Sequence, residues 1–200
     1  MFKFLSYILL KSINYNAALN NSELTIRPAE FADTREISLI LAHSFYNFAD
    51  YLTWMYPILQ FTICEDLRYR LRSAAPLYCC LVATYTDSEV GLSVAGTAEI
   101  TLRTPSFWSN NIQYPYISNL AVRENYRRQG IGSQLLARCE QIALDWGYNE
   151  TRLHVLDKNN SAKELYNQNG YEVCQIEPNW GQFLLDYSPR LLLKKRVESN

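Results

Sequence analysis

The chain has 200 residues, of which 48% are hydrophobic, and its 19 Lys and Arg against 20 Asp and Glu leave a formal charge of -1. This length favours one domain with a buried core. The near-neutral charge excludes a global field that attracts nucleic acid or an anionic membrane, so any phosphate site must be local. Five cysteines without C-x-x-C spacing argue against a disulfide framework or a zinc site. We therefore expect no metal and a reducing, cytoplasmic setting.

The first 22 residues form an extension of unknown role. Apolar residues in Met1–Leu19 recur at the spacing of one helical face, but the apolar run Phe4–Leu10 is far too short to span a bilayer. A loosely held extension or docking helix is favoured over a signal peptide or surface attachment. We expect the folded domain to cover residues 23–197.

Strands and helices alternate after residue 23 without an internal repeat, which predicts an α/β or α+β fold. Strands are expected where β-prone residues lie between turn residues: Leu24–Arg27, Leu77–Thr86, Val90–Arg103, Pro115–Val122, Thr151–Leu156, Tyr171–Ile176 and within Gly181–Val197. Helices are expected where apolar residues recur every three to four positions: Asp33 or Thr34 to about Tyr46, Pro57 to before Pro76, the segment after Gly132 to Trp146, and Asn159–Asn169. Asp87 and Ser88 mark a hairpin between the second and third strands.

The run R-R-Q-G-I-G, residues 127–132, lies between an expected strand and an expected helix. Glycines let the backbone approach an anion closely, and a helix N-terminus presents free N–H groups with partial positive charge. The run lacks the Lys-Ser/Thr of a Walker A loop and the third glycine of the dinucleotide fingerprint. Taken alone, it is either a phosphate site or a basic surface turn.

Two longer motifs favour the phosphate site. The stretch YISNLAVRENYRRQGIGSQLL resembles the cofactor motif of the GNAT superfamily, and N-x-x-A-x-x-x-Y-x-x-x-G-Y, from Asn159 to Tyr171, resembles the family's next motif. Together with PNWGQF and RLLLKK, the chain resembles the plastid and cyanobacterial group of these N-acetyltransferases. The resemblance implies acetyl-CoA as co-substrate and a mixed, mostly antiparallel sheet of about seven strands flanked by about four helices. This sheet would splay after the strand that ends near Val122.

The resemblance also implies which residues hold the cofactor. The backbone of residues 120–122 would pair with the pantetheine arm, and the amides of residues 128–133 would hold the pyrophosphate. The complete predicted set is Leu120, Ala121, Val122, Arg127, Arg128, Gln129, Gly130, Ile131, Gly132, Ser133, Asn159, Ala162 and Tyr166.

Acetyl transfer needs a base for the amine and an acid for the departing thiolate. Tyr166 matches the family's tyrosine near the thioester sulfur, and its reference pKa of ~10 is close to the ~8.5 of a thiol. Its alternative role is packing. His154 and Tyr116 match a catalytic pair of some protein N-terminal acetyltransferases, and alternation along Thr151–Leu156 would point His154 away from the core. Glu99 is a reserve base, and His43 is interpreted as structural.

The acceptor is predicted to be a protein or peptide amine. Tyr51, Trp54, Tyr56 and Trp180 fall where acceptor-binding loops of the family lie, although these side chains could equally pack as a lid. An α-amine has a pKa of ~7.7 to 8.0 and lysine ~10.4, so a weak base suits N-termini first and lysines second. Small amines come third, because a polycation would favour an acidic cluster. A module that binds acyl-CoA without turnover stays open, as does the oligomeric state.

Overall fold

A computed structural model describes residues 23–45, 54–73, 75–87, 91–104, 113–177 and 188–198. Its strands are β1 Glu23–Pro28, β2 Tyr78–Asp87, β3 Gly91–Arg103, β4 Tyr114–Val122, β5 Glu150–Leu156, β6 Glu172–Glu177 and β7 Arg190–Arg196. Its helices are α1 Thr34–Phe45, α2 Tyr56–Ser73, α3 Ile131–Asp145 and α4 Asn160–Gln168. Two single-turn 3-10 helices, Phe31–Asp33 and Glu124–Tyr126, precede α1 and α3.

The described strands form one sheet in the order β1-β2-β3-β4-β5-β7-β6. Only β4 and β5 pair in parallel, and the other neighbours are antiparallel. The expected hairpin is the β2–β3 pair. The predicted fold, a mixed and mostly antiparallel sheet with flanking helices, is therefore confirmed.

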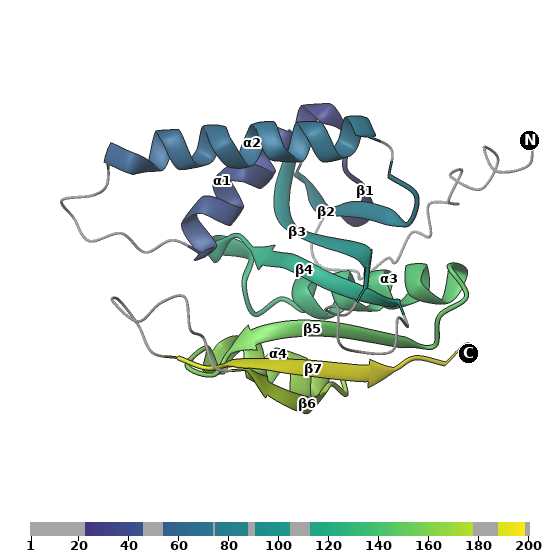
Figure 1. The fold of residues 1–200 in the computed structure, drawn as a ribbon. Helices are drawn as coiled ribbons and strands as arrows, with labels where there is room; N and C mark the ends of the chain where they lie inside the picture. Colours follow the sequence, from purple (N-terminus) through teal and green to yellow (C-terminus); the bar gives the residue numbers. More distant parts are fainter. Residues whose placement is uncertain are drawn as a thin grey trace, which may run out of the picture.

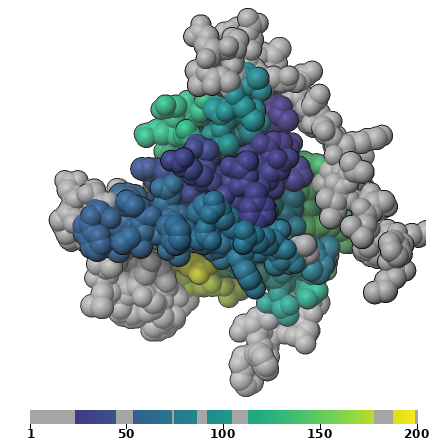
Figure 2. Space-filling model, turned by 90° about the horizontal axis from the view of Figure 1, so that it is seen from above, coloured from purple at the N-terminus to yellow at the C-terminus, as the bar shows by residue number. Residues whose placement is uncertain are grey.

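Helices cover both faces of the sheet (Figure 1). α1 and α2 pack on one face over Val82, Val94 and Ala121, and α2 crosses that face as a blue band (Figure 2). On the other face, α3 and Tyr166 of α4 pack over a larger core that includes Ile100, Ile117 and Leu153. Such burial of one face of each amphipathic element supplies most of the folding energy.

The strand β4 carries an extra residue in its middle. Thr97 of β3 pairs with Ala121 and Glu99 pairs with Ser118, so two residues of β4 lie opposite one residue of β3. Asn119, inside this β-bulge, has a φ of 52°, in the left-handed region that asparagine tolerates better than most residues. A bulge bends its strand and increases its twist, which contributes to the separation of β4 from β5.

Small differences from the expected boundaries have local causes. α2 begins at Tyr56, one residue earlier than expected. Pro57 therefore lies inside the first turn, where its missing N–H has no intrahelical partner to lose. β7 begins at Arg190, while residues 181–187 of the predicted last segment lie outside the described residues. No helix in the described part of the chain is both long enough and apolar enough to cross a membrane.

Candidate active site

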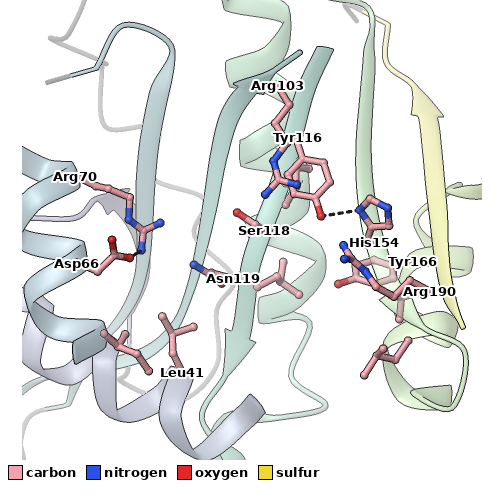
Figure 3. Close-up of a pocket in the computed structure, with 15 residues that line it drawn as sticks. Leu41, Asp66, Arg70, Arg103, Tyr116, Ser118, Asn119, His154, Tyr166 and Arg190 are labelled. Carbon is pink, nitrogen blue, oxygen red and sulfur yellow. Dashed lines mark hydrogen bonds and ion pairs between the residues drawn. The ribbon is translucent and has the colours of Figure 1, made fainter. Parts of the chain in front are cut away.

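A cavity of about 530 Å³ opens where β4 and β5 separate (Figure 3). The two strands pair only at Tyr116 with Arg152 and at Ile117 with Leu153. Beyond this point the backbone edge of β4 that faces β5 has no strand partner in the described residues. The lining side chains come from both helical layers and four strands: Leu41, Ile63, Asp66, Arg70, Arg103, Tyr116, Ile117, Ser118, Asn119, Leu120, His154, Val155, Leu156, Tyr166 and Arg190.

Tyr116 and His154 meet across the cavity. The Tyr116 hydroxyl lies 2.8 Å from Nδ1 of His154, and the two rings are tilted by 53°. Burial alternates along β5, with Leu153 and Val155 in the core and His154 on the opposite face. This alternation is the one expected from the sequence, and it directs His154 into the cavity.

The second ring nitrogen of His154 is buried and near a carboxylate. Nε2 lies 3.2 Å from Glu177 Oε2, out of line for a hydrogen bond. Burial and the positive charge of Arg190 lower the pKa of His154 from its ordinary 6.5, against the opposite effect of Glu177. The imidazole is therefore neutral at pH 7 and able to accept a proton.

Tyr166 reaches the cavity from α4. It is only 7% exposed, and its ring meets Tyr171 edge to face, with ring centroids 6.0 Å apart. Burial, followed by the nearby Tyr116, raises the pKa of Tyr166 to about 12, above the reference value of 10. The phenol therefore keeps its proton at working pH, and full transfer of that proton to a thiolate is uphill.

Glu99 is buried, and its carboxylate accepts hydrogen bonds from two residues that line the cavity, Arg70 and Asn119. The carboxylate is 1% exposed and accepts hydrogen bonds from Arg70, from the Tyr78 hydroxyl at 3.1 Å and from Asn119 Nδ2 at 2.9 Å. Burial and the charge of Glu99 raise the pKa of Tyr78. Arg70, Tyr78 and Asn119 occupy both carboxylate oxygens, and Glu99 does not line the cavity, so this geometry argues against Glu99 as the reserve base.

The predicted phosphate turn has the backbone of an anion-binding site. Arg128 and Gly130 have φ values of 62° and 78°, and Gly130 is the N-cap of α3. The first intrahelical bond joins Gln134 N to Gly130 O, so the amides just before Gln134 have no carbonyl of their own helix to bind. A Cβ on Gly130 would meet no atom within 4 Å, whereas one on Gly132 would lie 3.0 Å from Leu165 Cδ2. Gly130 therefore faces open space, and Gly132 permits close packing of α3 on α4.

The side chains of the turn have partners of their own. Arg127 Nε donates to Val122 O at 3.0 Å, and exposed Arg128 pairs with Glu164 at 3.2 Å. Gln129 Oε1 accepts from the Tyr85 hydroxyl at 3.3 Å. The backbone amides are therefore the main groups that could bind an anion, and exposed Arg128 could add positive charge beside them.

The other predicted cofactor residues lie on both sides of the cavity. Leu120 lines it, Ala121 is buried against α1 and α2, and Val122 packs on the opposite core. Asn159 is the N-cap of α4, and its Oδ1 accepts from the amide of Ala162 at 3.1 Å. This capping bond gives Asn159 a structural role whether or not it contacts a cofactor.

The structure describes two of the four aromatic residues predicted to bind the acceptor, and neither lies at the cavity. Trp54 is 64% exposed, and Tyr56 stacks on His43 with centroids 5.4 Å apart; neither lines the cavity. Tyr51 and Trp180 lie outside the described residues. Sequence reasoning missed the cavity arginines, because Arg70, Arg103 and Arg190 come from three elements and share no motif. No cluster of His, Cys, Asp or Glu in the described ranges could hold a metal ion.

Comparison with known proteins identifies the class. The family model described as "Acetyltransferase (GNAT) family" matches residues 43–171. The chain is 30% identical over 173 residues to GCN5-related N-acetyltransferase 10, chloroplastic, of Arabidopsis thaliana, covering 82% of this chain and 68% of the relative.

Solved structures show the same fold. The protein yncA from Salmonella typhimurium, solved with its cofactor acetyl-CoA, gives a TM-score of 0.63 at 18% identity, covering 89% of this chain and 96% of that chain. Arabidopsis thaliana NAA60, solved with a bisubstrate analogue, gives 0.61 at 16% identity, covering 88% and 99%.

The chain is therefore an acyltransferase, an N-acetyltransferase with acetyl-CoA as its co-substrate. It belongs to the GNAT family and resembles the plastid group of that family, as the sequence motifs predicted.

Proposed function

We propose that this enzyme acetylates the α-amines of protein N-termini. His154 and Tyr116 would act together as the general base, and Tyr166 would donate a hydrogen bond to the leaving sulfur. The observation that carries the proposal is the 2.8 Å contact between the Tyr116 hydroxyl and Nδ1 of His154 in the cavity between β4 and β5. The NatC complex, solved with Gag peptide and CoA, shares the fold and supports a peptide acceptor as a fold-level analogy.

Acetyl-CoA would lie with its pyrophosphate on the amides of residues 128–133 and its pantetheine along residues 120–122. The helix N-terminus after Gly130 favours negative charge, and the β4 edge that faces β5 offers free backbone groups to an amide-bearing arm. Tyr166 would then stand near the thioester, because it lines the cavity from the α4 side of the sheet.

The acyl transfer would proceed by direct attack. The amine nitrogen bonds to the thioester carbonyl carbon, the carbon–sulfur bond breaks, and the sulfur leaves as a thiolate. A neutral His154 with its proton on Nε2, beside Glu177, can accept a hydrogen bond at Nδ1 from Tyr116. The amine's proton passes to the Tyr116 oxygen while the Tyr116 proton moves to Nδ1. Tyr166 donates a hydrogen bond to the thiolate, which solvent then protonates.

The strength of this base favours an α-amine. A lysine needs roughly 3 kcal/mol more than an α-amine to reach its neutral form. A histidine whose pKa is below 6.5 is a weak base, so it suits the acceptor that deprotonates more easily.

The test is to incubate the full chain with acetyl-CoA and peptides while following free thiol and acetylated product. Matched peptides would carry either a free α-amine with no lysine, or a blocked N-terminus with one lysine. We expect α-amine acetylation at the higher kcat/KM. Preferential lysine acetylation, acetylation of polyamines alone, or cofactor binding without thiol release would each contradict the proposal.

The domain and compartment form part of the same proposal. The acetyltransferase domain would cover residues 23–197, which extends beyond the family match to include β1 and β7. All five cysteines are free, which supports a reducing compartment such as the cytoplasm; the Arabidopsis relative is named chloroplastic. Localising the tagged full chain would test this part.

A further inference from the structure

Three arginines and one carboxylate line the cavity (Figure 3). Arg70 is neutralised, because it pairs with Asp66 at 2.7 Å and with the buried Glu99. It therefore belongs to the structural cluster around Glu99, and its charge has little effect on a ligand.

Arg103 and Arg190 differ from Arg70. Among the residues that the structure describes, neither has a carboxylate within 4.0 Å. Arg103 Cζ lies 3.5 Å from the centroid of the Tyr116 ring. Glu177 faces Arg190 in the β6–β7 register, but its carboxylate lies beside His154.

Both guanidinium groups act electrostatically on His154 and Tyr116, which together form the proposed general base. The charges of Arg190 and Arg103 lower the pKa of His154, and both oppose the effect of burial on the pKa of Tyr116. The same two charges repel the ammonium form of any acceptor that approaches Tyr116. An acceptor that brings its own carboxylate would remove this repulsion and form charge-assisted bonds.

We propose that Arg103 and Arg190 bind a carboxylate of the acceptor, and that preferred substrates carry an acidic side chain in the first two residues. The inference rests on the proposed N-terminal acetylation and names its substrate class. Consecutive Cα atoms are about 3.8 Å apart, so a carboxylate near the Tyr116 ring belongs within one or two residues of an amine near its hydroxyl. Guanidinium groups suit this role because their planar donor sets match a carboxylate.

The test compares peptides that differ by one isosteric change, Asp against Asn or Glu against Gln, at each of the first two positions. With the full chain and saturating acetyl-CoA, we expect kcat/KM to be about tenfold higher for the acidic member at one position, the range for a charged hydrogen bond. The ratio of these kcat/KM values, acidic peptide over amide peptide, should fall as salt rises from 50 to 500 mM. Arg103→Gln and Arg190→Gln should each bring the ratio toward one.

Arg68→Gln is the matched control. Arg68 lies on α2, pairs with Glu65 and does not line the cavity, so its loss should leave the ratio unchanged. Because the readout is a ratio within one variant, a general loss of activity does not affect it, and thermal melts check folding.

Two groups of outcomes are distinguishable. Equal kcat/KM for both members, a preference for the amide, or an acidic preference that survives both cavity variants would overturn the arginine assignment while leaving N-terminal acetylation intact. If no α-amine peptide released thiol, the proposed function would fail, and this inference with it.

Discussion

The Tyr116 hydroxyl and Nδ1 of His154 are 2.8 Å apart although they belong to strands that pair at only two positions. The contact connects β4 and β5 at the point where the sheet opens. A positioned base contributes typically 10²- to 10⁴-fold. His154→Ala should therefore lower kcat about 100-fold at pH 7, and Tyr116→Phe less severely because a water can replace the hydroxyl. Wild-type rates in both variants, with acetyl-CoA bound, would exclude the pair as the base.

Once the rate is expressed per neutral α-amine, whose pKa is ~7.7 to 8.0, the acidic limb of kcat/KM should lie below pH 6.5. Burial and Arg190 lower the pKa of His154, so the neutral base dominates above its folded pKa and is lost as pH falls through that value. The same shift favours the fold at neutral pH, and this contribution disappears as pH falls from 6.5 through the folded pKa. A pH–rate profile with His154→Ala as control checks the assignment. An unchanged acidic limb in His154→Ala would refute it.

Tyr166→Phe should lower kcat by about 100-fold, with little change in acetyl-CoA affinity. Because the pKa of Tyr166 is about 12, wild-type activity should show no loss from its ionisation below pH 10. Steady-state kinetics and calorimetric titration separate the two effects. A wild-type kcat would leave Tyr166 with packing alone, as its edge contact with Tyr171 allows.

Gly130→Ala should weaken acetyl-CoA binding at a stability cost of about 1 kcal/mol, typical of a positive φ in a residue with Cβ. Gly147→Ala is a matched control, since Gly147 also has a positive φ, 86°, and free space around its Cα. It lies beyond the other end of α3, and its replacement should cost stability without changing affinity. Gly132→Ala should mainly lower the melting temperature, because its Cβ contacts Leu165. Equal affinities for the Gly130 and Gly147 variants would place the pyrophosphate elsewhere.

Glu99→Gln should destabilise the fold by about 2 kcal/mol, because it removes the buried charge that Arg70 pairs with. The full cost of breaking a buried pair is reduced here, since Arg70 is partly exposed. Chemical denaturation measures the loss. If Glu99 were instead the base, kcat would fall and the acidic limb of the pH profile would vanish in this variant.

The sequence predicted most of the fold because helical and strand periodicities differ clearly. The pattern of apolar residues predicted the order of the elements and the β2–β3 hairpin. It also predicted that His154 points away from the core. Tyr116 and His154 were paired only through family resemblance, because a sequence pattern does not reveal which residues of separate strands meet. The cavity arginines and the Glu99 cluster were missed for the same reason. The reference pKa of ~10 is too low for Tyr166, because its burial, which the sequence does not reveal, raises its pKa to about 12.

The extra residue at Asn119 shifts the alternation of side chains between the two faces of β4 by one position. Side chains four positions apart normally share a face of a strand, yet Ile117 packs with the α3 core and Ala121 with the α1 and α2 core. Deleting Asn119 would restore regular alternation without turning the end of β4 over, because Ser118 and Ala121 lie opposite Glu99 and Thr97 and so already share a face. The deletion would instead remove the Asn119 donor to Glu99 and the local bend of the strand. The bulge therefore links the opening of the sheet to the buried carboxylate, and the phosphate turn would keep its side of the sheet without it.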